Sequence, residues 1–521
     1  MRTIQRLELV VGWTNLLVGY ALWTLMMYLT DVWKLPFTDA AVILNLYYEV
    51  SAFLPLLLQF LVDTLMGNFW MLLISSLAYS MGLVFLAMST PPLLSKVTGS
   101  CSSYEPECIG DAQRVLFYTA LAFIAVGTAG HTVSLSSFVE EQGQDADSAP
   151  DNVTFGSIIE VRVRKVVGFG IPCFAVLGFP YIKPWSLHFG IPAIFSVVAT
   201  LIFMSGSSSY TCVEPQGSPL TMVMRVFVAA ASKNNHPHPY HSQLNGMANS
   251  EIPHTCHPLR CLNKAALVLP NQSLEEQQNN RWKLCTVAEV EYTKHIVRWV
   301  PMAISFMSLG LLISLGVTFF VEQAKHMNHK AVGSLTVPLT IFWWITAQAR
   351  SIVPGVYYTI SVLSHPNEVT RHARAGTKVS MLIGILCCLT AAKVESHRLE
   401  RNHPISVFWL LPQFILLGAT QGMYESGLAL TSSQIFRFRP HLAKFMALFT
   451  SMGINMGFIG SIIAINVLGK VTKTGGKQGW FQDTLNHSRL DNYYYFLAGL
   501  CAANLVLYYM VWKFCRGEDD S

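Results

Sequence analysis

The sequence predicts an all-α membrane protein with about twelve transmembrane helices arranged in two six-helix bundles. Composition is the first observation: 52% of the 521 residues are hydrophobic and 12% are charged, and a mean hydropathy of +0.40 is too apolar for an ordinary soluble domain. Second, apolar stretches of roughly 18 to 25 residues, long enough to cross a bilayer, recur along the chain. Third, a long polar segment divides these stretches into two sets.

The expected spans follow from the positions of these apolar stretches. The first set covers residues 8–30, 41–63, 70–89, 115–139, 166–182 and 187–205. The second set covers residues 299–320, 333–357, 377–395, 405–430, 443–467 and 492–512. The fifth span is the least regular, because prolines interrupt it and proline removes a helix hydrogen bond. We therefore predict an N-terminal bundle at 1–205, a hydrophilic linker at 206–298 and a C-terminal bundle at 299–521.

Basic residues predict how the chain inserts into the membrane. If the N-terminus is cytoplasmic, the cytoplasmic side holds 21 of the 35 lysines and arginines, against 13 on the outer side and Arg350 within a span. We therefore expect both termini and the linker in the cytoplasm. This bias accounts for the net charge of +5 and requires no nucleic-acid partner. The first apolar run lacks a small-residue cleavage pattern, so we expect it to remain as a span.

In this topology two loops on the outer side carry residues suited to that compartment. Cys101 and Cys108 follow the third span, and the alternatives for them are a disulfide or two free thiols. Asn486 begins an Asn-His-Ser glycosylation sequon on the same side.

Catalytic and cofactor-binding motifs are missing from the sequence. It contains no phosphate-binding loop, dinucleotide fingerprint, nucleophile elbow or HExxH motif, so we expect neither an enzyme nor a cofactor. The linker does carry possible metal ligands, namely His236, His238, His241, His254, Cys256, His257 and Cys261. Their spacing lacks the repeated ligand pairs of structural zinc sites, and we predict no metal.

A polar stripe distinguishes the fourth span. Thr128, Thr132 and Ser136 recur at four-residue intervals, so they share one face of a helix with His131 beside it. Ionisable residues within other spans are Glu49, Arg350 and Glu425, and such residues indicate function by default.

Two six-helix halves joined by a cytoplasmic linker are the layout of major facilitator transporters, whose substrate site lies between the halves. Several stretches also resemble the plant nitrate/peptide transporter family of proton-coupled oligopeptide transporters. Examples are "RWKLCTVAEVEYTKHIVRWVP" (281–301), "TFFVEQAKHM" (318–327), "LLPQFILLGATQG" (410–422) and "LDNYYYFLAGLCAANLVLYY" (490–509). They occur in the order of the family over nearly the whole chain. The resemblance implies a major facilitator fold and transport of a small-molecule solute by alternating access.

The resemblance also implies that charged residues of the family are replaced in this chain. The lysine of the fourth helix corresponds to Thr132, and the glutamate of the tenth helix to Gln421. Because both members of that pair are lost together, neither remains as a stranded buried charge. The Glu-x-x-Glu-Arg pattern of the first helix is lost as well: its second glutamate and its arginine correspond to Thr14 and Asn15, preceded by Trp13.

Two further regions are assigned by the same resemblance. A cavity-lining tyrosine and glutamine of the seventh helix correspond to Ile313 and Leu315. The gating loop after the second helix keeps Asp63 and Gly67 but has Asn68 at its basic position. The substitutions predict that proton coupling is weakened, relocated or absent, because threonine, asparagine and glutamine side chains cannot titrate.

A replacement polar network is the hypothesis for relocated coupling. It pairs Glu49 or Glu425 with His131 or Arg350, and Glu425 lies one helical turn after Gln421 on the same face. For His131 the structural alternative is a neutral, hydrogen-bonded core histidine, which we prefer to a proton relay. For Arg350 the alternative is a gating or packing role, and for Glu49 a solvated carboxylate.

The sequence thus predicts a transporter of a small organic solute or nitrate, with protons as a potential partner and the lipid bilayer as its surroundings. Zwitterionic peptides are disfavoured, because the charges that would bind both peptide termini are gone. The family resemblance implies the plasma membrane or the vacuolar membrane. The alternative hypothesis is a non-transporting solute sensor or a regulatory partner of an active transporter.

Overall fold

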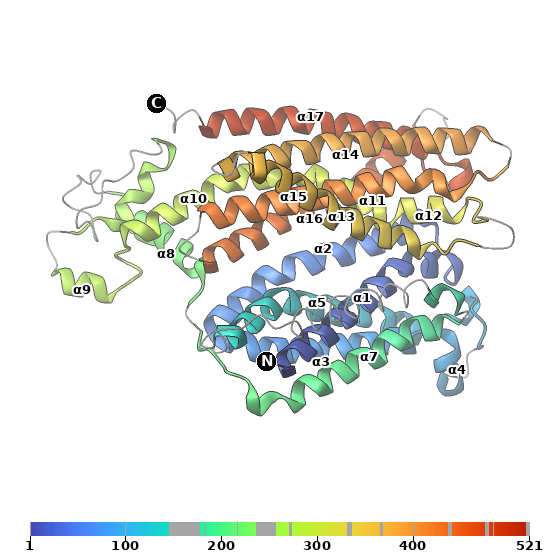
Figure 1. The fold of residues 1–521 in the computed structure, drawn as a ribbon, viewed down its shortest axis with the longest axis horizontal. Coiled ribbons are helices and arrows are strands. Elements are labelled where there is room, and N and C mark those ends of the chain that lie inside the picture. Colours follow the sequence, from blue (N-terminus) through green and yellow to red (C-terminus); the bar gives the residue numbers. More distant parts are fainter. Residues whose placement is uncertain are drawn as a thin grey trace.

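Long helices that run side by side make up the computed structural model of this chain (Figure 1). The structure describes residues 2–98, 101–144, 178–182, 184–215, 217–235, 257–269, 273–330, 336–364, 368–401, 403–435, 440–474, 479–482 and 484–516. Among these residues regular β-strands are absent, and only two isolated β-bridges occur.

The N-terminal helices form the lower half of the molecule in Figure 1. They are α1 (Arg2–Asp31), α2 (Phe37–Leu61), α3 (Gly67–Met88), α4 (Pro91–Thr98), α5 (Asp111–Gln144) and α7 (Trp185–Ser205), with a π-helical turn at Val62–Met66. Helix α3 packs against α5 and α7, and α2 packs against α5. The expected span at 166–182 lies outside the described residues up to residue 177.

The C-terminal helices form the upper half (Figure 1). They are α10 (Val287–Ser305), α11 (Met307–Val317), α12 (Phe319–Lys325), α13 (Thr340–Ser364), α14 (Val369–Glu400), α15 (Leu411–Ile435), α16 (Pro440–Val471) and α17 (Leu490–Arg516). Helix α14 packs between α15 and α17, and α13 packs against α15.

The expected span at 299–320 is broken into three helices. The first break, at Phe306, follows Pro301 inside α10, and proline removes one helix hydrogen bond. The second break is at Thr318, whose backbone leaves the helical region with φ −121° and ψ −94°. Its Oγ1 donates to Ser314 O at 2.6 Å, a local bond that competes with the helix ladder.

Seven stretches of described residues are long and apolar enough to cross a membrane, judged by length and composition, and one of them joins α2 with α3. Helices α1, α13 and α15 are not among the seven; α1 carries Asn15, α13 carries Arg350, and α15 carries Gln421 and Glu425. Helix α5, with 34 residues, is about 50 Å long, so it extends beyond a bilayer core of about 30 Å.

The linker contains a small folded unit of its own. It comprises α8 (Pro219–Ser232), a 3-10 segment at His257–Ala266 and α9 (Leu274–Asn279), at the left end of the molecule in Figure 1. Buried apolar side chains join α8, the 3-10 segment and the start of α10, and a capping box of Thr286 and Glu289 begins α10. Helix α4 lies at the opposite end of the molecule.

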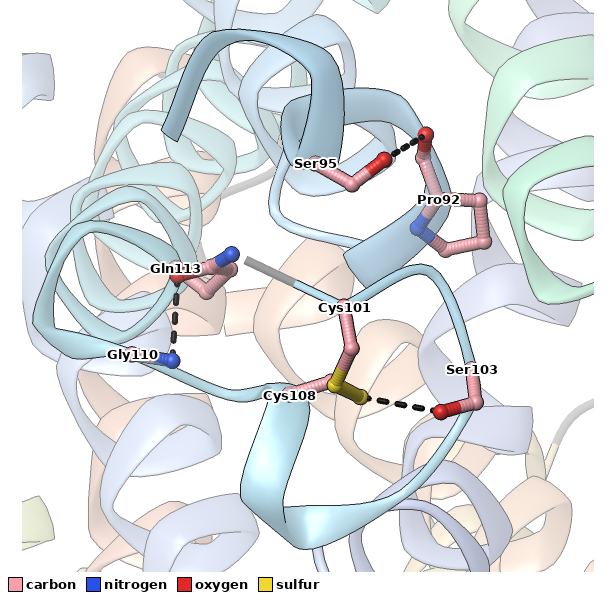
Figure 2. Close-up of a disulfide and its surroundings, with 7 residues drawn as sticks. All are labelled: Pro92, Ser95, Cys101, Ser103, Cys108, Gly110 and Gln113. Carbon is pink, nitrogen blue, oxygen red and sulfur yellow. Dashed lines mark hydrogen bonds between the residues drawn. A yellow bond between two sulfur atoms is a disulfide. The ribbon is translucent and has the colours of Figure 1, made fainter. Parts of the chain in front are cut away.

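Figure 2 shows the loop that follows α4. A disulfide joins Cys101 and Cys108, whose Cα atoms are 5.1 Å apart, and Ser103 Oγ donates to Cys108 Sγ at 3.0 Å. Of the two alternatives for these cysteines, the structure contains the disulfide. Asn486 lies in a 3-10 turn, Leu485–His487, where its Oδ1 accepts a hydrogen bond of 2.6 Å from Arg398 Nη1.

The two halves contact each other at three levels. In the middle, Asn45 Nδ2 of α2 donates to Ser461 Oγ of α16 at 3.1 Å. At one end Lys325 of α12 pairs with Asp31 of α1. At the other end Lys444 of α16 donates to the backbone carbonyl of Val133 in α5. Contacts between the halves therefore occur in the middle and at both ends of the interface in this conformation.

Candidate functional site

Helices α13 and α15 approach each other closely because α15 carries glycines where they meet. A Cβ atom added to Gly422 would lie 1.9 Å from Arg350 O, and one added to Gly418 would lie 2.2 Å from Thr346 O. Glycines spaced by four residues lie on one face of a helix and let a second helix approach. This approach places Arg350 of α13 beside Glu425 of α15.

Arg350 and Glu425 form a bidentate ion pair. Arg350 Nε donates to Glu425 Oε2 at 2.7 Å, and Nη2 donates to Oε1 at 2.8 Å. Gln421 Nε2, one turn away, donates to the same Oε1 at 3.1 Å. The side chains of Arg350 and Glu425 are 49% and 38% exposed, so the pair is accessible rather than packed into the core.

The face of α13 that carries Arg350 is directed towards α1 of the other half. Trp343, two turns before Arg350, packs against Gly19 and Tyr20 of α1. Because α1 and α13 run in opposite directions, seven residues along α13 correspond to about seven residues back along α1, near Gly12. A Cβ atom added to Gly12 would meet no atom of the described residues within 4 Å.

His131 points into the N-terminal half. Its ring is buried, its Nε2 lies 2.9 Å from Ser76 Oγ, and its Nδ1 donates to Asn15 Oδ1 at 3.4 Å. The ring also lies against Tyr79, with 5.0 Å between centroids. Thr14 is buried and lines a small pocket together with His131. These contacts match the alternative of a hydrogen-bonded core histidine.

Two hydroxyls of the polar stripe bond to their own helix. Thr128 Oγ1 donates to Ile124 O, and Thr132 Oγ1 donates to Thr128 O, each at 2.8 Å. Thr132 is exposed and Thr128 half-buried. Satisfied hydroxyls of this kind supply a mildly polar surface without a charge.

The remaining predicted residues lie apart from these two groups. Glu49 is buried in α2. Ile313 is half-buried beside an apolar cluster that includes Phe306 and Tyr424, and Leu315 is fully buried in the main apolar core. The Trp13 side chain lies outside the described residues.

The predicted gating loop forms one wall of a polar pocket at the end of the molecule near the linker. Gly67 has a φ of +71°, which favours glycine, and Asp63 accepts a hydrogen bond of 2.7 Å from Gln59. Asn68, at the family's basic position, donates to Glu141 at 2.6 Å. Lys444 of α16 also lines this pocket and donates to Ser137 Oγ at 2.5 Å.

Sequence reasoning missed the roles of Lys444 and Lys325. In the sequence Lys444 contributes only to the basic bias that predicts the membrane orientation, and Lys325 is only one residue of the family motif "TFFVEQAKHM". Lys325 Nζ donates to Thr30 Oγ1 at 2.9 Å, and Thr30 Oγ1 donates to Glu322 at 3.2 Å. Both lysines join partners about 300 residues away in the chain, and no local pattern indicates such contacts.

The chain is similar to known proteins in sequence and in fold. A family model described as the POT family (PTR2) matches residues 69–481 of the chain. Protein NRT1/PTR FAMILY 5.5 of Arabidopsis thaliana is 40% identical over 534 aligned residues, covering 98% of this chain and 97% of that protein. Protein NRT1/PTR FAMILY 5.6 of the same plant is 30% identical over 514 residues, covering 94% and 87%.

Solved structures resemble the fold. An auto-inhibited POT family peptide transporter has a TM-score of 0.66 at 15% identity, covering 98% of this chain and 97% of its own. The POT family transporter PepTSo also has a TM-score of 0.66 at 15% identity, covering 99% of both chains.

Proposed function

The chain belongs to the POT family of membrane transporters, and we propose that it carries a small organic solute or nitrate by alternating access. The observation that carries this proposal is the accessible Arg350–Glu425 pair on helices of one half, on the face of α13 that is directed towards α1 of the other half. A guanidinium group binds carboxylate or nitrate oxygens in the same planar, two-point geometry that it uses with Glu425.

The proposed solute is neutral or weakly acidic. Thr132 offers a hydroxyl where an ammonium-bearing side chain would be needed to attract a peptide carboxylate, and Asn15 engages His131. Gln421 keeps the shape of a glutamate but cannot ionise, and it supports Glu425 with a hydrogen bond. The resemblance to the family implies that these three positions take part in coupling transport to protons. We propose that this coupling is relocated to other residues in this chain or lost.

The membrane orientation is also proposed. The linker unit lies at the end of the molecule opposite α4 and the Cys101–Cys108 disulfide loop (Figure 1). Disulfides form in oxidising compartments outside the cytosol, which supports a cytoplasmic linker and cytoplasmic termini. We propose a plasma-membrane or vacuolar location, and a division into residues 1–205, 206–298 and 299–521.

The test is uptake of a mixed panel into protein-expressing oocytes with membrane current recorded. The panel contains nitrate, dipeptides and plant hormone acids, supplied at acidic and near-neutral external pH. We expect flux of nitrate or of a hormone acid that falls in Arg350→Gln, with dipeptides carried poorly. Absence of flux together with solute-dependent thermal stabilisation of the purified protein would assign a sensor instead.

A further inference from the structure

Glu49 occupies the centre of a membrane-spanning helix. It is the thirteenth of the 25 residues of α2, which places it near the middle of the bilayer. Only 3% of the residue is exposed. The hydrocarbon region strongly disfavours charge, so an ionisable carboxyl group at this depth indicates a function.

The carboxyl group faces the other half of the protein. Tyr48 of α2 stacks on Phe458 of α16 with 5.4 Å between ring centroids, and Asn45 donates to Ser461. Glu49 therefore lies in the contact between α2 and α16, and these two helices belong to different halves.

Among the residues that the structure describes, the groups packed around Glu49 supply no counter-charge. Residues 445–469 of α16 include no Asp, Glu, Lys, Arg or His. Residues 9–30 of α1 include no charged residue, and their titratable groups are Tyr20 and Tyr28. Next to Glu49 in α2 stand Tyr47 and Tyr48.

The π-helical turn Val62–Met66, α5 and α12 also contact α2, and their described ionisable groups lie near helix ends or have partners. Asp63 of the turn accepts from Gln59. On α5, Asp111, Arg114 and Tyr118 lie near the outer end, Glu140 and Glu141 lie near the other end, and His131 bonds to Ser76 and Asn15. On α12, Glu322 contacts Lys325 and His326, and Lys325 pairs with Asp31. An ionised Glu49 would therefore be a buried charge without a cation, which is the unfavourable case.

A buried acceptor lies one helical turn from Glu49. Asn45 is four residues earlier on the same face of α2, and its Nδ2 is engaged with Ser461. Its Oδ1 is buried and accepts no hydrogen bond from the residues that the structure describes, and the same holds for both Glu49 oxygens. A carboxylate only accepts, whereas a protonated carboxyl donates one O–H. The protonated form thus complements the Asn45 oxygen.

We propose that Glu49 is a proton-binding site at the contact between the two halves. In the conformation described here Glu49 is protonated and directs its O–H to Asn45 Oδ1. When α2 and α16 separate during alternating access, water reaches the carboxyl group, the O–H bond breaks, and the proton passes to water. This proposal rests on the proposed transport function, because rocking of the halves supplies the change of environment.

Infrared spectroscopy of the full-length protein in liposomes tests the site without a solute. We expect a carbonyl band of a neutral carboxyl group in the wild type that is missing from Glu49→Gln. Ser51→Ala is the matched control, since it changes a buried polar group on the same helix that cannot hold this proton. Identical bands in the wild type and Glu49→Gln would overturn the proposal. A Glu49→Gln protein that fails to fold while Glu49→Asp folds would also overturn it, because the ionised form would then be required.

Uptake into the same liposomes tests the coupling, with nitrate, a dipeptide and a plant hormone acid as probes. For a carried probe we expect an inward proton gradient to stimulate uptake by the wild type and by Ser51→Ala. In Glu49→Gln the ratio of uptake with and without the gradient should fall to one, while downhill flux persists. Stimulation that survives in Glu49→Gln would overturn the proposal. If no probe is carried, the transport proposal fails for this panel, and the infrared band still decides whether Glu49 binds a proton.

Discussion

Arg350 of α13 holds Glu425 of α15 through two hydrogen bonds of 2.7 and 2.8 Å, although 75 residues separate them in the chain. The pair is accessible, and ion pairs exposed to solvent contribute about 0 to 1 kcal/mol to stability. The pair therefore adds little to the stability of the fold, and its proposed role is recognition of the solute.

The first prediction concerns this pair. Arg350→Gln and Glu425→Gln each remove the two-point contact, so each single variant should lower uptake, while folded yield changes little because the pair is accessible. The double variant should also keep its yield and should not recover uptake of an anionic solute. Size-exclusion yield and uptake of the four proteins form a double-mutant cycle. Uptake that is unchanged in Arg350→Gln would contradict a role of the pair in binding the solute.

A second prediction concerns Gln421. In Gln421→Glu the new carboxylate replaces an N–H donor to Glu425 and adds a second negative charge one turn away. We expect a lower folded yield, and partial recovery when Thr132→Lys supplies a cation across the interface. The readout is the yield of folded protein for both variants. Equal yields of the single and double variants would count against the pairing of the fourth and tenth spans.

Close helix packing leads to a third prediction. Gly422→Ala would place a methyl group 1.9 Å from Arg350 O, so α13 and α15 must move apart and the ion pair must shift. Overpacking of this kind costs about 1 to 3 kcal/mol. Thermal unfolding of the purified protein should show the loss. Gly355→Ala in α13 is the control, because its added Cβ meets no atom within 4 Å.

Cysteine labelling checks the proposed orientation. Cys108→Ser breaks the disulfide and leaves the exposed Cys101 as a free thiol. A membrane-impermeant maleimide should label Cys101 in intact cells. The exposed Cys261 of the linker is the internal control and should react only after permeabilisation. The reverse pattern would mean that the chain inserts in the opposite orientation.

The linker supplies a pH prediction. Burial lowers the pKa of Lys233 from 10.5 to about 8, and its Nζ donates to Ala265 O at 3.2 Å and to Leu267 O at 2.7 Å. Between these two pH values the folded state binds fewer protons than the unfolded state, so stability rises with pH across that window. Below about pH 8 Lys233 is charged in the folded state, and the full free-energy cost of burying its ammonium group then destabilises that state.

Hydrogen exchange of α8, corrected for the intrinsic rate at each pH, measures this effect. Protection should increase from neutral to alkaline pH in the wild type and much less in Lys233→Met. The control is Lys264→Met, since Lys264 lies in the same unit and donates from an exposed position to Asn234 O. An unchanged profile in Lys233→Met would exclude Lys233 as the source.

Much of the fold could be predicted because hydrophobicity is a property of each segment. Bilayer-length apolar runs predicted the all-helical membrane protein, and eleven of the twelve expected spans are helical over most of their described residues. Landmarks such as "TFFVEQAKHM" predicted the POT family, which the family model and the Arabidopsis relatives confirm. The break at Thr318 was not predicted, because it depends on one hydroxyl competing for a backbone carbonyl.

The sequence by itself determined where helices span, which helices carry polar residues, and that charges common in the family are replaced. Only the tertiary structure decided which of those polar residues meet. In the folded protein His131 points into the N-terminal half, Arg350 pairs with Glu425, and Glu49 is buried where α2 contacts α16. The reason is physical: hydropathy is set residue by residue, whereas side-chain pairing depends on the rotation of each helix and on contacts between distant segments.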